Sequence, residues 1–292
     1  MKSWIEAARP RTLPLALSSI FMGSILAAYN EVFDAQIFGL ACLTTILLQV
    51  MSNFANDYGD TQNGADSAER VGPARAVQSG EITPEQMKKA IYITGALAFI
   101  SGVLLLLKAF WPAHTAYLYS FLGFGILSIL AAYFYTAGSK PYGYAGLGDL
   151  SVFLFFGLLG VMGTFFLYAK HISLAESLPA ISCGLLAVGV LNLNNIRDIN
   201  SDKAAGKHTI AVRLGKSKAI VYHLSLLVGA AISLVAYFMW SGESSWWFLL
   251  GFPLLALNGI KLTKLPNPDP LLKQLSLTSL LLVLLVGLSL LI

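Results

Sequence analysis

Long apolar stretches dominate this sequence and limit the folds that it can adopt. Most of them reach the 18 residues or more that an α-helix needs to cross a lipid bilayer. Lipid offers no partner for free backbone polar groups, so each stretch is expected to form a helix. We identify nine, at approximately residues 12–29, 36–55, 91–108, 114–137, 150–169, 174–195, 218–240, 245–262 and 271–292.

Composition excludes an ordinary soluble protein. Of the 292 residues, 56% are hydrophobic and 12% are charged, whereas soluble domains average roughly a quarter charged residues. A soluble chain of this length would be expected to form about two domains. We predict instead an all-α membrane protein in which residues 1–292 form a single polytopic domain.

The distribution of basic residues predicts the topology. If the N-terminus is cytoplasmic and the nine helices alternate, all but two of the 19 lysines and arginines face the cytoplasm, the exceptions being Lys108 and Lys170. Such asymmetry follows the positive-inside rule. The long polar segments at about 56–90 and 196–217 fall on this same side. Because functional residues concentrate in long loops, we expect the chemistry there.

Two clusters of asparagine and aspartate occupy matching positions. Each lies at the cytoplasmic end of a predicted helix, and each has an asparagine four residues before an aspartate: Asn56 before Asp60, and Asn194 before Asp198. We interpret them as a weak internal repeat of two units about a pseudo-two-fold axis. The clusters would then face each other across a central cavity open to the cytoplasmic side. The aspartates are Asp57, Asp60, Asp66, Asp198 and Asp202.

Facing carboxylates indicate a Mg²⁺ and diphosphate site. Mg²⁺ takes one or two carboxylates and completes its shell with water and substrate phosphates. We predict that these five aspartates hold Mg²⁺ and that Asn56 orients the first cluster. Solvated loop residues are the alternative, but acids at membrane depth are costly and usually functional. Nearby cations can neutralise phosphate charge; they are Arg75, Arg197, Lys203 and Lys207.

At these residues the sequence resembles the UbiA superfamily of intramembrane aromatic prenyltransferases. The matching motifs are Asn56-Asp57-x2-Asp60-x5-Asp66 and Asp198-x3-Asp202. Asp66 lies six residues after Asp60, where the commoner spacing is four. The longer spacing is similar to that of the menaquinone branch. Residues 8–14 and 135–149 also resemble that branch.

The resemblance implies a nine-helix bundle and a Mg²⁺-dependent reaction, and the absence of targeting signals suits the prokaryotic plasma membrane. A polyprenyl diphosphate would donate its prenyl group to 1,4-dihydroxy-2-naphthoate, with loss of CO₂ and formation of demethylmenaquinol. By analogy, the diphosphate is expected to contact Arg11, Lys140 and Lys203, with Arg75 and Arg197 as further candidates. Tyr135 could face the allylic cation through its ring. The resemblance therefore assigns catalytic roles to Asn56, Tyr135 and Lys203.

Other functions stay open at this point. Another aromatic acceptor, such as 4-hydroxybenzoate, homogentisate or haem, would use the same fold and metal site. A transporter would also have repeats and polar groups at helix breaks, but its site is usually near the bilayer midplane. Here the acids lie at one membrane face, which favours an enzyme. A CDP-alcohol phosphotransferase would need an Asp-Gly-x2-Ala-Arg stretch, which this sequence lacks.

Overall fold

A computed structural model describes residues 1–64, 75–138 and 140–292, and every element within those ranges is helical. Eight helices are long and apolar enough to cross a membrane, which confirms the predicted all-α membrane fold. The first span joins α1 (Lys2–Ala8), η1 (Pro10–Thr12) and α2 (Leu13–Tyr29). The others are α3 (Ala35–Gln62), α4 (Pro84–Phe110), α5 (Thr115–Phe134), the composite helix α6 (Gly148–Val152), η3 (Phe153–Gly163) and α7 (Thr164–Ala169), then α8 (Ser177–Arg197), α11 (Lys216–Ser241) and α13 (Asp269–Leu291).

The ninth predicted span is shorter than the rest. Residues 245–262 contain η4 (Trp247–Gly251), which is a 3₁₀-helix, and α12 (Phe252–Leu262). A 3₁₀-helix rises about 2.0 Å per residue and an α-helix about 1.5 Å, so together they reach roughly 26 Å. This length is close to the hydrocarbon thickness of about 30 Å. The 3₁₀ start thus gives a short apolar stretch almost the reach of a full span.

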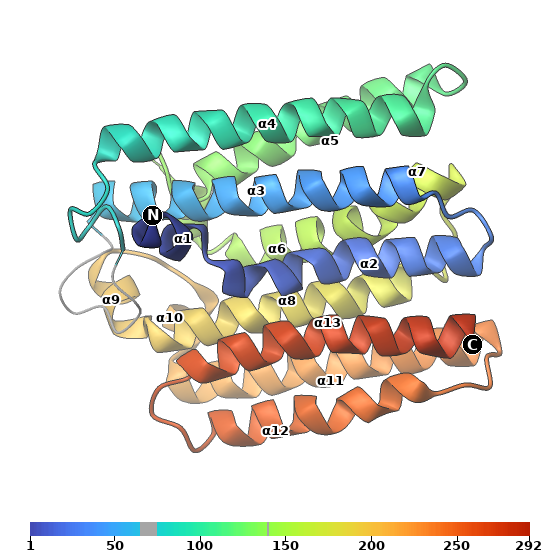
Figure 1. Cartoon of the computed structure of the whole chain (residues 1–292). Coiled ribbons are helices and arrows are strands. Elements are labelled where there is room, and N and C mark those ends of the chain that lie inside the picture. The colour runs from blue at the N-terminus through green and yellow to red at the C-terminus, as the bar shows by residue number, and fades with distance from the viewer. Residues whose placement is uncertain (65–74, 139) are drawn as a thin grey trace.

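The helices lie side by side, and the polar connections gather at one end of the bundle. Figure 1 places the N-terminus, α9 (Ile199–Ala204) and α10 (Ile210–Leu214) at this end, with α7 and the C-terminus at the other. The helix α2 packs against both α3 and α13, and α8 packs against η3 and α11. Both acidic clusters belong to the end that carries α9, as the sequence predicts.

Glycines bring the central helices unusually close together. A Cβ added to Gly157 of η3 would lie 2.8 Å from the Ala180 carbonyl oxygen of α8. One added to Gly160 would lie 2.8 Å from Ser19 Cβ of α2. Small residues permit such close approach between membrane helices. The segment η3 is a π-helix, a rare form often found at functional sites, and it contributes to both cavities described below.

Candidate active site

The two acidic clusters meet in one cavity of about 200 Å³, which we call the polar chamber. Its walls come from the ends of α3 and α8, from α9 and from the start of α13. Segments around residues 135–144 and 207–209 close it further. The cluster residues that line the polar chamber are Asn56, Asp60, Asn194, Asn195, Asp198 and Asp202. The arrangement that the repeat predicts is therefore present.

Asp60 is held by cations and by a tyrosine hydroxyl in the polar chamber. Arg75 Nη2 donates to Asp60 Oδ2 at 3.0 Å, and Tyr144 OH donates to Oδ1 at 2.8 Å. Lys207 Nζ lies 3.0 Å from Asp60 Oδ1 and 3.5 Å from Asp202 Oδ1. Lys207 therefore joins the first cluster to the second.

Asp202 is buried close to other carboxylates, and this shifts its proton affinity. The pKa of Asp202 is raised to about 6, chiefly by burial and also by the negative charges of Asp198 and Asp60. The ammonium of Lys207 opposes that rise. Carboxylates crowded together in this way gain stability from a bound cation.

Asp57 lies differently from its neighbours in the first cluster. Its side chain is 1% exposed, and it does not line the polar chamber. Its two oxygens accept hydrogen bonds from the backbone N–H groups of Ala76 and Val77, both at 3.1 Å. Asp57 thus anchors the turn that carries Arg75, and its role as a metal ligand stays a prediction.

Arg197 and Asp198 form a buried pair. Arg197 Nε and Nη2 donate to the two oxygens of Asp198 at 2.9 and 2.6 Å. Arg197 also donates to Asn194 Oδ1 at 2.7 Å and to Asp269. Arg197 holds Asp198 in position and is not among the residues that line the polar chamber, and its contact with diphosphate stays a prediction.

The end of α3 packs tightly against the segment that carries Tyr135. Thr136 Oγ1 donates to Asn56 Oδ1 at 2.9 Å and lies 3.1 Å from the Ala55 carbonyl oxygen. A Cβ on Gly59 would lie 2.5 Å from the Thr136 carbonyl group. This close approach lets both Asn56 and Tyr135 line the polar chamber.

The remaining predicted residues have three different outcomes. Arg11 and Arg75 line the polar chamber. Lys140 and Lys203 are exposed and are not among its lining residues. Asp66 lies outside the described residues. Lining residues that were not predicted from sequence include Tyr144 and Lys273, although Tyr144 falls within residues 135–149, whose resemblance to the menaquinone branch was a signal for it.

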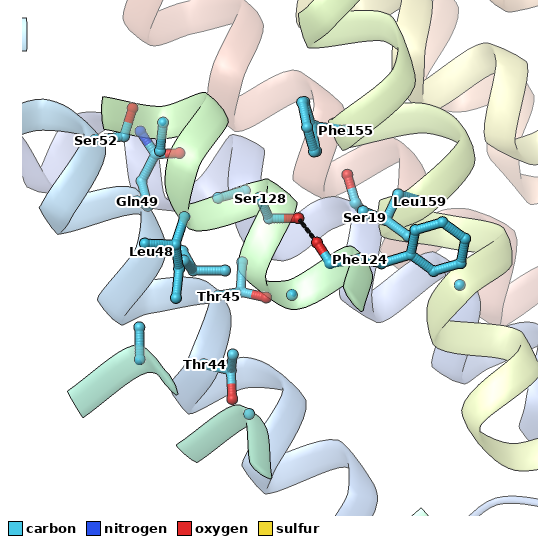
Figure 2. Close-up of a pocket in the computed structure, with 18 of the residues that line it drawn as sticks. Ser19, Thr44, Thr45, Leu48, Gln49, Ser52, Phe124, Ser128, Phe155 and Leu159 are labelled. Atoms are coloured by element: carbon cyan, nitrogen blue, oxygen red, sulfur yellow. Dashed lines mark hydrogen bonds between the residues drawn. The ribbon is translucent and has the colours of Figure 1, made fainter. Parts of the chain in front are cut away.

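A second cavity, of about 400 Å³, adjoins the first, and we call it the apolar cavity. Figure 2 shows Leu48 of α3, Phe124 of α5, and Phe155 and Leu159 of η3 around it. Hydroxyl groups on its walls bond to helix backbone, as Ser128 does to the Phe124 carbonyl oxygen at 2.8 Å. The two cavities lie directly side by side, because they share the lining residues Gln49, Asn56, Tyr135, Val152, Phe156 and Leu191.

A model of the UbiA prenyltransferase family matches residues 16–285. The chain belongs to this family. It is 48% identical to the 1,4-dihydroxy-2-naphthoate octaprenyltransferase of Haemophilus influenzae, over 100% of this chain and 96% of that protein. It is 49% identical to the enzyme of the same name from Escherichia coli, over 87% of this chain and 82% of that protein.

Solved structures of the family share the fold. A UbiA homolog from Aeropyrum pernix K1 gives a TM-score of 0.69 at 18% identity, covering 95% of this chain and 96% of that one. A UbiA homolog from Archaeoglobus fulgidus, bound to GPP and Mg²⁺, gives 0.66 at 15% identity, covering 99% of both chains. At such identities the likeness concerns the fold alone.

The donor atoms of the polar chamber fit a Mg²⁺ ion that is shared with a diphosphate. Within the described ranges, no three His, Cys, Asp or Glu side chains form a group that could hold a metal without other ligands. Mg²⁺ does not need such a cage, because it keeps waters and binds one or two carboxylates together with substrate phosphates. Asp60, Asp198 and Asp202 offer carboxylates of this kind at the chamber wall.

Proposed function

We propose that this chain transfers a polyprenyl group from a polyprenyl diphosphate to 1,4-dihydroxy-2-naphthoate, with loss of CO₂, to give demethylmenaquinol. The observation that carries the proposal is that the polar chamber, with both acidic clusters, lies directly beside the apolar cavity and shares six lining residues with it. Such a pair of cavities suits a substrate with a charged head and a long apolar tail. The full-length identity of 48% to an octaprenyltransferase supports the choice of acceptor.

The head of the donor would occupy the polar chamber. Asp60, Asp198 and Asp202 would hold Mg²⁺, directly or through water. When bound, Mg²⁺ supplies positive charge that stabilises the leaving diphosphate. Arg75 and Lys207, which now neutralise Asp60, would share their hydrogen bonds with the phosphate oxygens. Asn56 and Tyr135 would lie where the head meets the tail, because both line the two cavities.

The tail of the donor would enter the apolar cavity. Its lining residues run along α3 from Asn56 to Ala41, about 22 Å of helix. A cavity of 150 Å³ holds benzene, so 400 Å³ holds about 16 carbon atoms, or roughly three isoprene units. The rest of a longer tail would pass sideways into lipid. The helix α5, none of whose residues is buried, forms part of this wall.

The reaction needs no nucleophile from the protein. The allylic C–O bond breaks, and its electron pair leaves with the diphosphate. The ring carbon that bears the carboxylate then bonds to the allylic carbon. Loss of CO₂ returns the electron pair of the broken C–C bond to the ring, which becomes aromatic again. The Tyr135 ring lies at the junction of the cavities, where its face could stabilise the allylic cation.

The basic residues support an orientation in the membrane. The excess of lysine and arginine at the end that carries both clusters favours a cytoplasmic N-terminus and a cytoplasmic active site. We propose the prokaryotic plasma membrane as the location.

One assay tests the proposed function. Membranes containing the protein are incubated with Mg²⁺, a polyprenyl diphosphate and carboxyl-labelled 1,4-dihydroxy-2-naphthoate, and a matched sample receives EDTA. We expect labelled CO₂ and a lipid-soluble prenylated naphthoquinol in equal amounts, and neither with EDTA. Transfer to 4-hydroxybenzoate or another phenol, without CO₂ release from the naphthoate, would show that the acceptor is a different aromatic compound. No transfer to any acceptor would contradict the enzyme assignment and favour a transporter.

A further inference from the structure

One side of the polar chamber is formed by residues from opposite ends of the chain. Arg11 comes from η1, and Leu272, Lys273 and Ser276 come from the first two turns of α13. We call these four residues the basic wall. Lys273 and Ser276 are three residues apart, so they lie on one face of α13. This wall contributes cations to the chamber but none of the clustered aspartates.

The start of α13 holds Arg11 in place. Arg11 Nη1 lies 3.4 Å from Asp269 Oδ2, and Ser276 Oγ donates to the Arg11 carbonyl oxygen at 3.3 Å. Asp269 lies at the N-terminus of α13, where the helix dipole favours a negative side chain. The Arg11 segment is therefore fixed at two points, and its guanidinium is kept at the chamber surface.

The charges of the basic wall are less compensated than those elsewhere in the chamber. Arg75 is paired with Asp60, and Lys207 lies between Asp60 and Asp202. By contrast, Arg11 shares Asp269 with Arg197, and within the described residues Lys273 makes no ion pair. The wall thus has positive charge available for an anion, whereas the cations on the opposite side of the chamber are paired with the aspartates.

We propose that the basic wall binds the carboxylate of the aromatic acceptor, through Arg11 and Lys273. This inference rests on the proposed function and adds the site at which the second substrate is recognised. Arg11 offers the forked hydrogen bonds that match a carboxylate. Leu15 and Leu272 line the chamber next to these cations and would contact the ring. The diphosphate is then left to the side that has the aspartates, Arg75 and Lys207.

The test separates the carboxylate of the acceptor from its ring. With Mg²⁺ and polyprenyl diphosphate, kcat and KM are measured for 1,4-dihydroxy-2-naphthoate and for the donor. Naphthalene-1,4-diol, which has the same ring and hydroxyls but no carboxylate, is used as a competing ligand, and its inhibition constant is measured. The variants are Arg11→Gln, Arg11→Lys and Lys273→Gln. Lys261→Gln is the control, because Lys261 is exposed at the end of α12 and does not line the chamber.

We expect Arg11→Gln to raise the acceptor KM about tenfold or more, since a charge-assisted bidentate contact is lost. Lys273→Gln should raise it several-fold, and Arg11→Lys should recover part of the loss. The donor KM and the inhibition constant of the diol should change less than about twofold. Lys261→Gln should behave as wild type. Melting temperatures of all variants show whether each is folded. If Arg11→Gln does not fold, the acceptor KM of Lys273→Gln still decides the test.

Three outcomes would overturn the inference. A raised donor KM with an unchanged acceptor KM would assign the wall to the diphosphate. An unchanged KM for both substrates would leave Arg11 and Lys273 as residues that only set membrane topology. Equal increases in the KM for the naphthoate and in the inhibition constant of the diol would indicate that the substitution changed the shape of the chamber rather than a contact with the carboxylate. Failure of the wild-type chain to prenylate the naphthoate is a different result, since it would contradict the proposed function itself.

Discussion

The first acidic cluster contains carboxylates with different tasks. Asn56 and Asp60 are four residues apart and so share a helix face, while Asp57 is turned about 100° from Asn56. The structure follows this geometry, because Asn56 and Asp60 line the polar chamber and Asp57 binds the backbone of the following turn. Residue type and spacing could predict the cluster, and helical periodicity separates the chamber side chains from the anchor.

Replacement of Asp57 by Asn tests this division. The amide has one oxygen to accept hydrogen bonds from Ala76 and Val77, where the carboxylate has two. A buried N–H left without a partner costs about 1–3 kcal/mol, so the melting temperature should fall by several degrees. The Mg²⁺ concentration that gives half-maximal activity should stay within about threefold of wild type. A much larger rise in that Mg²⁺ requirement, with unchanged stability, would instead make Asp57 a metal ligand.

The positions and partners of other residues could not be predicted from the sequence. Lys140 and Lys203 were assigned by analogy, and both are exposed away from the chamber lining. Asp269 bonds to Arg197 and Arg11, which are far from it in the chain. Such pairings depend on how α13 packs beside the N-terminal segment, and no local pattern encodes that packing.

At the scale of elements, the junction of the cavities depends on two glycines, Gly143 and Gly148, that leave space for the Tyr135 side chain. A Cβ on Gly148 of α6 would lie 2.7 Å from Tyr135 OH, and one on Gly143 would lie 3.1 Å from the ring. The Tyr135 ring also packs edge-on against Tyr142, with centroids 5.4 Å apart. Glycine at these positions therefore sets where the ring lies.

Gly148→Ala is expected to lower kcat about tenfold, because the added methyl group must push the Tyr135 ring away from its place. Steady-state assays should show the change in kcat, with the donor KM changed less. The matched control is Gly123→Ala on α5, where an added Cβ meets nothing within 4 Å. If Gly148→Ala retained wild-type kcat, the position of the Tyr135 ring would not matter for the reaction.

The helices around the apolar cavity predict how the donor KM depends on tail length. The cavity holds roughly three isoprene units. Each isoprene unit that fits inside the cavity buries apolar surface and so strengthens binding. Units beyond the third or fourth would lie in lipid or detergent and would add little binding free energy. In a series of allylic diphosphates in detergent, the KM should fall steeply up to about three or four units and then level off. A KM that continued to fall evenly up to eight units would contradict this account of the cavity.

At the scale of the whole molecule, nine apolar stretches and their flanking charges were enough to predict the bundle and its polar end. The short span at 245–262 was harder, since its 3₁₀ start at η4 depends on packing against α13. The cavities could not be predicted, because their volumes depend on the close contacts of α2, η3 and α8. The prediction that the two acidic clusters line one cavity depended on the internal repeat, because only the repeat relates the two halves of the chain.

The central claim is that both acidic clusters form one site for Mg²⁺ and diphosphate. The most direct measurement is Mg²⁺-dependent binding of a polyprenyl diphosphate to the purified wild type, Asp60→Ala, Asp202→Ala and the double variant. Residues that act together give non-additive losses in such a cycle. We predict that each single variant loses at least about 100-fold in affinity and that the double variant loses little more. Independent, additive losses, or near-normal binding by either single variant, would contradict a shared site.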